Sequence, residues 1–196
     1  MEDDMRRTTI KRKTKETDIT ITLNLDGEGN VSCNSGNGFF DHMIGAFGKH
    51  GRFDIEISCM GDLEVDFHHS AEDIGIVLGQ AFAECTQNKA GMKRFGTAFT
   101  PMDEALVMVN SDISGRPFLV FNSEFETERT GDFEAQLVEE FFRAFAMNAL
   151  ITLHINKIYG RNTHHIIEAI FKSAGRSLAQ SVEISGDEIL STKGVI

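Results

Sequence analysis

The sequence predicts an α/β protein of the α+β type in which two similar halves are fused in one chain. Three observations predict this fold class: strand-type alternation occurs in both halves, apolar helical stripes follow the strands, and one short motif occurs twice. We place the boundary so that residues 1–93 form the first half and residues 94–196 the second. With 196 residues, 41% of them hydrophobic, the chain is long enough to bury a substantial core.

The first half alternates between predicted strands and helices. "RRTTIKRK" (6–13) is typical of an edge strand with a solvated face, and "TDITITLNL" (17–25) is typical of a half-buried strand. After the turn "GEGN", apolar residues at helical spacing predict a helix over 40–50, with Gly51 as its C-terminal cap. "FDIEISC" and "DLEVDF" alternate around a turn at residues 60–61, which predicts a hairpin. A stripe from Ile74 to Phe82 then predicts a helix that begins at two adjacent histidines.

The second half repeats this order after "NKAGMKRFG". "ALVMVNSDI" (105–113) and "PFLVFNSEF" (117–125) predict strands, and a stripe from Val138 to Ala149 predicts a helix. "ITLHIN" (151–156) predicts a further strand, followed by a turn at residues 160–163. A stripe from Ile167 to Leu178 predicts the last helix.

Composition excludes several classes of function. A net charge of −11 argues against nucleic-acid or anionic-membrane partners, which are bound through clustered Lys and Arg. Cys33, Cys59 and Cys85 are widely spaced without a C-x-x-C pattern, so we expect buried small hydrophobic residues rather than disulfides or a thiolate zinc site. The chain lacks a long apolar run and its N-terminus lacks the apolar core of a signal peptide, so we expect a cytoplasmic protein.

The repeated motif is H-H-x-x-E at the start of the last helix of each half. One copy contains His68, His69 and Glu72, and the other contains His164, His165 and Glu168. On a helix the glutamate can approach the first histidine at i+4 or the second at i+3, whereas neighbouring histidines point about 100° apart. Two adjacent imidazoles therefore tend to serve two different centres.

Imidazole and carboxylate groups are the ligands of a transition metal such as Mn, Fe or Zn, and two copies of the motif predict a pair of metal positions. A single copy would be more typical of a polar helix start satisfied by caps and water, but the duplication favours metal. "FFDHM" adds His42, and "LVEEFF" places Glu139 and Glu140 at the corresponding position of the second half. A solvated helix face would also explain the two glutamates.

The motifs together resemble the imidazoleglycerol-phosphate dehydratase family of histidine biosynthesis. "RKTKET", "GFFDHM", "DFHHSAEDIGIVLG", "RFG", "PMDEAL", "SGRP", "LHI", "HHIIEAIFKS" and "STKG" occur in family order from about residue 6 to the C-terminus. The resemblance implies that each half is a four-stranded mixed sheet backed by helices. It also implies a homo-oligomer of 24 subunits around two Mn(II) ions per subunit, with sites shared between subunits.

Carried over by motif, the resemblance makes metal ligands of His42, His68, His69, Glu72, His164, His165 and Glu168. At Glu140 the family commonly has a metal-ligating histidine in "EHFF"-like sequences, whereas this chain has "EEFF". Because a carboxylate also binds Mn(II), we keep Glu140 in the ligand set with an altered affinity. Which histidine serves which ion stays open.

The family reaction converts imidazoleglycerol phosphate to imidazoleacetol phosphate by loss of water. The proton removed is not alpha to a carbonyl, so the substrate imidazole must accept the charge, as an imidazolate held by both metal ions. Glu16 in "RKTKET" matches the family glutamate that shuttles protons, although alone it would be an exposed strand residue. Asp103 in "PMDEAL" is a second candidate, for positioning substrate or ligands.

The substrate phosphate needs cationic partners in this acidic chain. Arg94, Arg116, Ser191 and Lys193 match the phosphate-binding positions of the family, although each would otherwise be an ordinary surface residue. Two other functions remain open. A dinuclear hydrolase would use two metals and a bridging hydroxide on a phosphoester, and a non-catalytic metal store would take up metal without needing Glu16 or the arginines.

Overall fold

The computed structural model describes residues 6–194, which form two four-stranded sheets. The first half contains β1 (Arg7–Lys13), β2 (Thr17–Asn24), β3 (Val31–Asn34), α1 (Gly38–Gly51), β4 (Asp54–Gly61) and α2 (His68–Cys85). The second half contains β5 (Phe95–Met102), β6 (Ala105–Asp112), β7 (Phe118–Asn122), α3 (Leu137–Ala149), β10 (Thr152–Tyr159) and α4 (Thr163–Val182). A short hairpin of β8 (Arg129–Thr130) and β9 (Phe133–Glu134) precedes α3.

Both sheets have the same topology, which confirms the predicted fold class. The strand orders are β1-β2-β4-β3 and β5-β6-β10-β7, and in each sheet the last pair is parallel while the others are antiparallel. β2 and β6 bury every second residue, as the alternation predicted. That residues 1–93 and 94–196 are separate domains stays a prediction.

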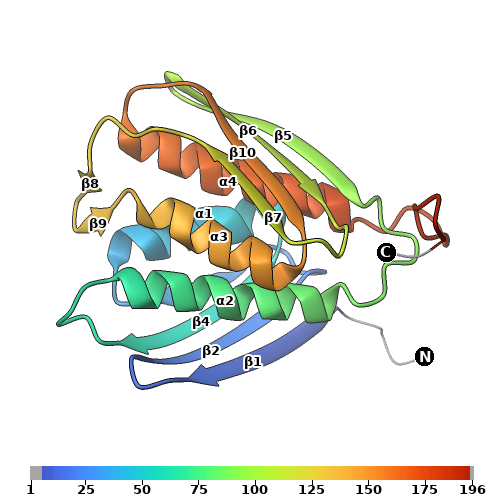
Figure 1. The fold of residues 1–196 in the computed structure, drawn as a ribbon, viewed down its shortest axis with the longest axis horizontal. Helices are drawn as coiled ribbons and strands as arrows, with labels where there is room; N and C mark the ends of the chain where they lie inside the picture. The colour runs from blue at the N-terminus through green and yellow to red at the C-terminus, as the bar shows by residue number, and fades with distance from the viewer. Residues whose placement is uncertain (1–5, 195–196) are drawn as a thin grey trace.

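The four helices lie between the two sheets (Figure 1). α2 packs on β1 and β2, and α4 packs on β5 and β6, so each sheet is covered by the last helix of its own half. The helices also pair across the halves, α1 against α4 and α3 against α2. One hydrophobic cluster therefore contains residues of both halves.

Two glycines at corresponding positions allow these helix pairs to approach closely. A Cβ on Gly175 of α4 would lie 2.2 Å from the carbonyl oxygen of Phe47 in α1. A Cβ on Gly79 of α2 would lie 2.6 Å from the carbonyl oxygen of Phe145 in α3. Backbone atoms occupy the space of the missing side chains, so the duplicated helices cross in the same way on both sides of the molecule.

The predicted hairpin of "FDIEISC" and "DLEVDF" is wrong in its second strand. β4 is paired with β2 on one side and with β3 on the other, so it has no free edge for a further strand. Residues 62–67 form a loop in which Leu63 and Val65 are 46% and 63% exposed. The alternation of this segment is therefore not burial on one face of a sheet.

The predicted C-terminal cap of the first helix is also wrong by one residue. α1 continues through Gly51, and Arg52 takes the left-handed conformation with φ 58°. Gly51 is required for packing, because a Cβ there would lie 2.6 Å from the ring of Phe53.

The sequence pattern missed β3, β5, β8 and β9. In β5 the buried positions are Gly96, Ala98 and Thr100, whereas Phe95 and Phe99 are 54% and 50% exposed. Small residues face the helices because α4 packs closely there, so the hydrophobic alternation is inverted. β3, β8 and β9 are too short to show a period.

The structure also tests the predictions for the cysteines, the basic N-terminal strand and membrane-spanning segments. Cys59 and Cys85 are buried, Cys33 is half-buried against the core, and all three are free thiols. "RRTTIKRK" is confirmed as an edge strand, β1. Within residues 6–194, no helix combines the length and apolar character needed to cross a bilayer.

Candidate metal and substrate site

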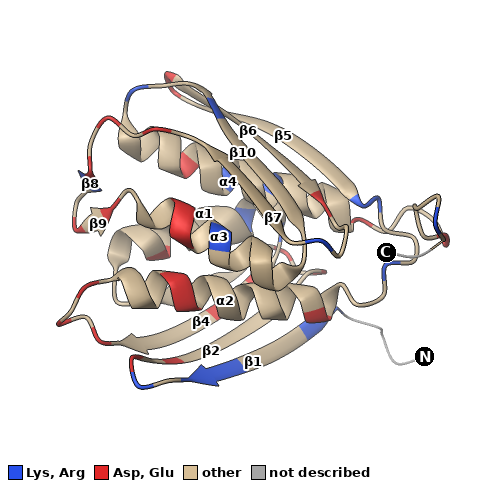
Figure 2. Cartoon of the chain, in the orientation of Figure 1, with Lys and Arg blue, Asp and Glu red and all other residues tan. Residues whose placement is uncertain are grey.

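All four helices begin at the same end of the molecule, on the left in Figure 1. This end carries His42, both H-H-x-x-E motifs and Glu140 in the early turns of the helices. Side-chain caps hold the histidine backbones. Asp66 accepts the N–H of His68 at 2.7 Å, and Asn162 accepts that of His164 at 2.9 Å. Acidic residues also gather at this end, as Figure 2 shows.

The two histidine pairs have the same geometry. The rings of His68 and His69 lie 6.4 Å apart at 80°, and those of His164 and His165 lie 6.0 Å apart at 82°. Helical geometry allowed the glutamate of each motif to approach either histidine, and in the structure it approaches the first. The Nε2–Oε2 distances are 3.9 Å from His68 to Glu72 and 3.3 Å from His164 to Glu168.

Within residues 6–194, one group brings three potential ligand atoms within 4.8 Å of one another: His42, His164 and Glu168. His42 comes from α1 and the other two from α4, so the pairing of these helices across the halves creates the group. The Nε2 atom of His42 lies 3.8 Å from Oε2 of Glu168. Phe39 packs edge-on against the ring of His164, with centroids 5.2 Å apart.

Glu168 is held by a residue that the sequence analysis missed. Its side chain is 10% exposed, and Oε1 lies 2.6 Å from Nζ of Lys172 one turn later. Burial of the Glu168 carboxyl opposes ionisation, but Lys172, His42 and His164 outweigh this effect and lower its pKa. Glu168 is therefore an anion whose Oε2 faces the two histidines. The i, i+4 spacing to a lysine was the only signal in the sequence.

The corresponding set of the other half is more open. α2 and α3 pack together, so His68, Glu72 and Glu140 lie on neighbouring helices. However, Glu72 is 47% exposed, and Oε2 of Glu140 lies 4.0 Å from Nε of Arg143. Within residues 6–194, the ligand atoms of these three residues do not all lie within 4.8 Å of one another, in contrast to those of His42, His164 and Glu168.

The second histidine of each motif contacts a carboxylate through Nδ1. His69 lies 3.0 Å from Oδ2 of Asp62, and His165 lies 2.7 Å from Oε2 of Glu104. These hydrogen bonds raise the pKa of both histidines. The contact with His165, together with the N–H groups of Asn162 and Arg161, lowers the pKa of Glu104 to about 2.

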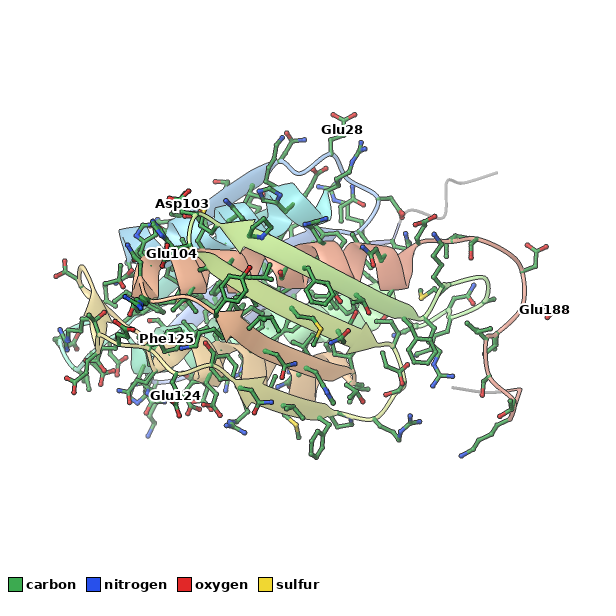
Figure 3. The ribbon with its side chains drawn as sticks, turned by 90° about the horizontal axis from the view of Figure 1, so that it is seen from above. Glu28, Asp103, Glu104, Glu124, Phe125 and Glu188 are labelled. Atoms are coloured by element: carbon green, nitrogen blue, oxygen red, sulfur yellow. The ribbon has the colours of Figure 1, made fainter. Side chains whose placement is uncertain are left out.

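The two catalytic candidates lie in corresponding turns at the same end. Glu16 is exposed in the turn between β1 and β2, where the hydroxyl of Thr14 accepts its N–H at 3.1 Å. Buried Asp73 anchors the turn by accepting the hydroxyl of Thr17 at 2.5 Å. The charge of Glu16 contributes to the raised pKa of His69. Asp103, in the turn between β5 and β6 (Figure 3), lies 3.7 Å from Nε2 of His165.

The candidate phosphate-binding residues lie at the end of the molecule opposite the histidines. Arg94, Arg116, Ser191 and Lys193 line one pocket with residues 188–192. Figure 3 shows this separation, with Glu188 of the pocket at one end and Asp103 and Glu104 at the other. Arg94 and Asp103 flank β5, whose length of eight residues corresponds to roughly 25 Å.

Arg94 is already engaged within the chain. Its Nε donates to Oδ1 of Asp112 at 2.7 Å, and its Nη1 donates to the carbonyl of Leu190 at 2.7 Å. Its backbone is left-handed, with φ 68°, and its guanidinium stacks on Phe95. Arg116 is 68% exposed, with Nη2 at 3.7 Å from Asp112. Arg94 therefore holds the C-terminal segment against the second sheet.

Comparisons with known proteins identify the family. A sequence profile of imidazoleglycerol-phosphate dehydratase matches residues 35–178. The imidazoleglycerol-phosphate dehydratase of Acetivibrio thermocellus is 52% identical over 193 residues, 97% of this chain and 99% of the relative. That of Alkaliphilus metalliredigens is 55% identical over 185 residues, 93% of this chain and 95% of the relative. The chain belongs to the imidazoleglycerol-phosphate dehydratase family.

Solved structures of imidazoleglycerol-phosphate dehydratases have the same fold. The Staphylococcus aureus structure has a TM-score of 0.84 at 41% identity and covers 91% of this chain and 99% of its own. The Pyrococcus furiosus structure has a TM-score of 0.82 at 36% identity and covers 95% and 100%. The chain is therefore an enzyme, a hydro-lyase of this family, whose activity belongs to histidine biosynthesis.

Proposed function

We propose that the chain dehydrates imidazoleglycerol phosphate to imidazoleacetol phosphate and uses two Mn(II) ions per subunit. The observation that carries this proposal is the convergence of one ligand atom each from His42, His164 and Glu168 within 4.8 Å of one another. The other half has His68, Glu72 and Glu140 at the corresponding positions in a more open arrangement, and this duplication supports a second metal position.

The donor groups suit the proposed metal. Imidazole nitrogens and carboxylate oxygens without thiolates fit Mn(II), and the ionised Glu168 supplies a hard oxygen ligand. One set would consist of His42, His164 and Glu168, and the other of His68, Glu72 and Glu140. The rings of His69 and His165 are inclined at 80° and 82° to those of their neighbours, and these two histidines would complete the ligands of a second centre in each case. The metals would supply Lewis-acid stabilisation of the negative charge on the substrate imidazole.

The remaining chemistry is proton transfer by the protein. Glu16 is exposed, faces the histidine end and has the freedom to take a proton from carbon and deliver one to the leaving hydroxyl. Asp103 lies beside Nε2 of His165, so we assign it to positioning substrate and ligands.

The separation of the two ends supports a site shared between subunits. A phosphorylated imidazole is much shorter than the distance of roughly 25 Å spanned by an eight-residue strand. The histidine end of one chain and the phosphate pocket of another would therefore hold one substrate. We include in the proposal the 24-subunit assembly, the roles of Arg94, Arg116, Ser191 and Lys193, and the cytoplasm as its location.

The test combines metal analysis with turnover. The protein is purified, stripped of metal and reloaded with Mn(II), and the appearance of an enolisable ketone from imidazoleglycerol phosphate is followed. We expect about two ions per chain, activity that returns on reloading, and smaller particles after chelation. Full activity after complete metal removal would contradict the proposal. Release of inorganic phosphate instead of ketone would indicate a dinuclear hydrolase.

Glu16→Gln separates catalysis from metal storage. This variant should lose roughly 10²–10⁴-fold in kcat and keep the metal content of the wild type. Glu28→Gln is the matched control, since Glu28 is an exposed glutamate elsewhere on the surface (Figure 3). Wild-type turnover by Glu16→Gln would remove Glu16 from the mechanism.

A further inference from the structure

We propose that Asp62 and Glu104 are positioning residues that hold His69 and His165 in the tautomer and ring orientation needed for metal binding. The inference rests on the proposed two-metal function and adds two residues to it. Asp62 Oδ2 lies 3.0 Å from Nδ1 of His69, and Glu104 Oε2 lies 2.7 Å from Nδ1 of His165.

Each contact has a defined chemical consequence. An ionised carboxylate can only accept a hydrogen bond, so the neutral ring carries its hydrogen on Nδ1, donates it to the carboxylate and presents the lone pair of Nε2. The side chains of His69 and His165 are 33% and 24% exposed, so both rings reach the surface. Asp103 lies 3.7 Å from Nε2 of His165.

The internal duplication makes the contact informative. Glu104 directly precedes β6 and Glu16 directly precedes β2, so the two glutamates occupy corresponding positions. In the second half, Glu104 binds His165 and accepts the N–H groups of Arg161 and Asn162 at 3.2 and 2.8 Å. Within residues 6–194, the Glu16 side chain forms no comparable hydrogen bond, and His69 is bound by Asp62.

Asp62 comes from a different element. It begins the loop between β4 and α2, whereas the loop between β10 and α4 covers only residues 160–162 and contains no carboxylate. The same Nδ1 contact is thus made from non-corresponding positions, so it is not a simple by-product of the duplication. The arrangement also releases Glu16 from binding a histidine, which leaves its carboxylate available for proton transfer.

Asp62 gives the cleaner test because its carboxylate contacts only the His69 ring among the described residues, whereas Glu104 also fixes a loop. The measurements are the Kd and stoichiometry of Mn(II) and the Tm of the metal-free protein. Asp62→Asn keeps the shape but loses the charge, and we expect its Mn(II) affinity to fall by about 10- to 100-fold at an unchanged metal-free Tm. Glu104→Gln should weaken Mn(II) binding by a similar factor.

Two controls separate positioning from general effects. Glu64→Gln removes one exposed charge from the same loop and should bind Mn(II) like the wild type. Asp62→Glu should recover part of the affinity, since a carboxylate is restored. Wild-type Mn(II) affinity in both Asp62→Asn and Glu104→Gln would overturn this inference alone. Failure of the wild-type protein to bind Mn(II) would overturn the proposed function and this inference together.

Discussion

The two halves have the same backbone plan but different side chains at the helix starts. In the second half, Glu168 is buried, bound to Lys172 and close to two histidines. In the first half, Glu72 is half-exposed, and Ile76 occupies the position that corresponds to Lys172. Where α1 contributes His42, α3 contributes Glu140, which lies near Arg143.

This difference teaches that duplication reproduced the helix crossings while the donor groups diverged. Gly79 and Gly175 maintain the same approach of the helices on both sides. Within residues 6–194, three ligand atoms converge only in the second set, where two histidines face a buried glutamate that is bound to a lysine. We therefore expect the two metal positions to differ in affinity, with the His42 set the tighter one.

Replacing the glutamate of each set tests the predicted difference in Mn(II) affinity, and we expect the largest effect from these variants. Glu168→Gln should weaken Mn(II) binding at the His42 set by at least 10- to 100-fold, the loss typical of removing even an outer-shell partner, or about 1.4–2.7 kcal/mol. The purified variant should therefore contain one tightly bound Mn(II) fewer per chain. It also leaves Lys172 without its anion. Glu72→Gln, the matched variant, should lose less affinity because Glu72 is half-exposed. Metal analysis and Mn(II) titration measure both, and two tightly bound ions in Glu168→Gln would contradict the assignment.

The helix crossings can be broken without touching a ligand. Gly175→Ala places a Cβ 2.2 Å from the Phe47 carbonyl oxygen, and Gly79→Ala places one 2.6 Å from that of Phe145. Overpacking of this kind costs typically about 1–3 kcal/mol, which exceeds the gain of about 1 kcal/mol in helix propensity. Thermal unfolding should show a lower Tm for both, with the larger decrease in Gly175→Ala. An unchanged Tm would mean that the helices separate at no cost.

Much of the fold was predictable because it depends on periods that single sequences contain. The strands β2 and β6 bury every second residue, β10 buries Leu153 and Ile155, and the apolar stripes of the four helices are buried. These patterns predicted the elements. β5 was missed because close helix packing puts Gly96 and Ala98 inside and Phe95 and Phe99 outside. "DLEVDF" misled because no local pattern reveals that both edges of β4 are already paired.

The candidate site was predictable only as motifs. The duplicated histidines marked the helix starts, but the convergence of His42 with Glu168 depends on α1 packing against the helix of the other half. Glu104 and Lys172 were missed because their roles arise from contacts with His165 and Glu168. The distance between the histidine end and the phosphate pocket also required the structure, since motif order carries no spatial information.

Glu140→His would make the two sets alike. The imidazole would replace the carboxylate that lies near Arg143 and would match His42 of the other set. We expect Mn(II) affinity at the weaker position to rise by up to about tenfold, or about 1.4 kcal/mol. Competitive Mn(II) titration of Glu140→His and the wild type measures the change, and Glu126→Gln, at an exposed glutamate outside the helices, is the control. A weaker second ion in Glu140→His would mean that the carboxylate is the better ligand in this setting.

The smallest effect concerns an arginine–aspartate pair at the start of each half. Arg6 binds Asp26 and donates to the carbonyl of Val182 at 2.6 Å, which ties β1 to the end of α4. Arg94 binds Asp112 and donates to the carbonyl of Leu190 in the same manner. The hydrogen bond from Arg6 outweighs burial and lowers the pKa of Asp26.

Because the pKa of Asp26 is lower in the folded state, the ion pair stabilises the protein above pH about 4, and this contribution is lost as the pH falls through the lowered value. Asp26→Asn should therefore unfold at a lower urea concentration than the wild type at pH 7, and the difference should narrow in acid. Asp18→Asn is the control, since the Lys13 partner is 75% exposed and such surface pairs contribute about 0–1 kcal/mol. A difference between Asp26→Asn and the wild type that stays constant down to pH 3 would show that the Arg6 contact acts through shape rather than charge.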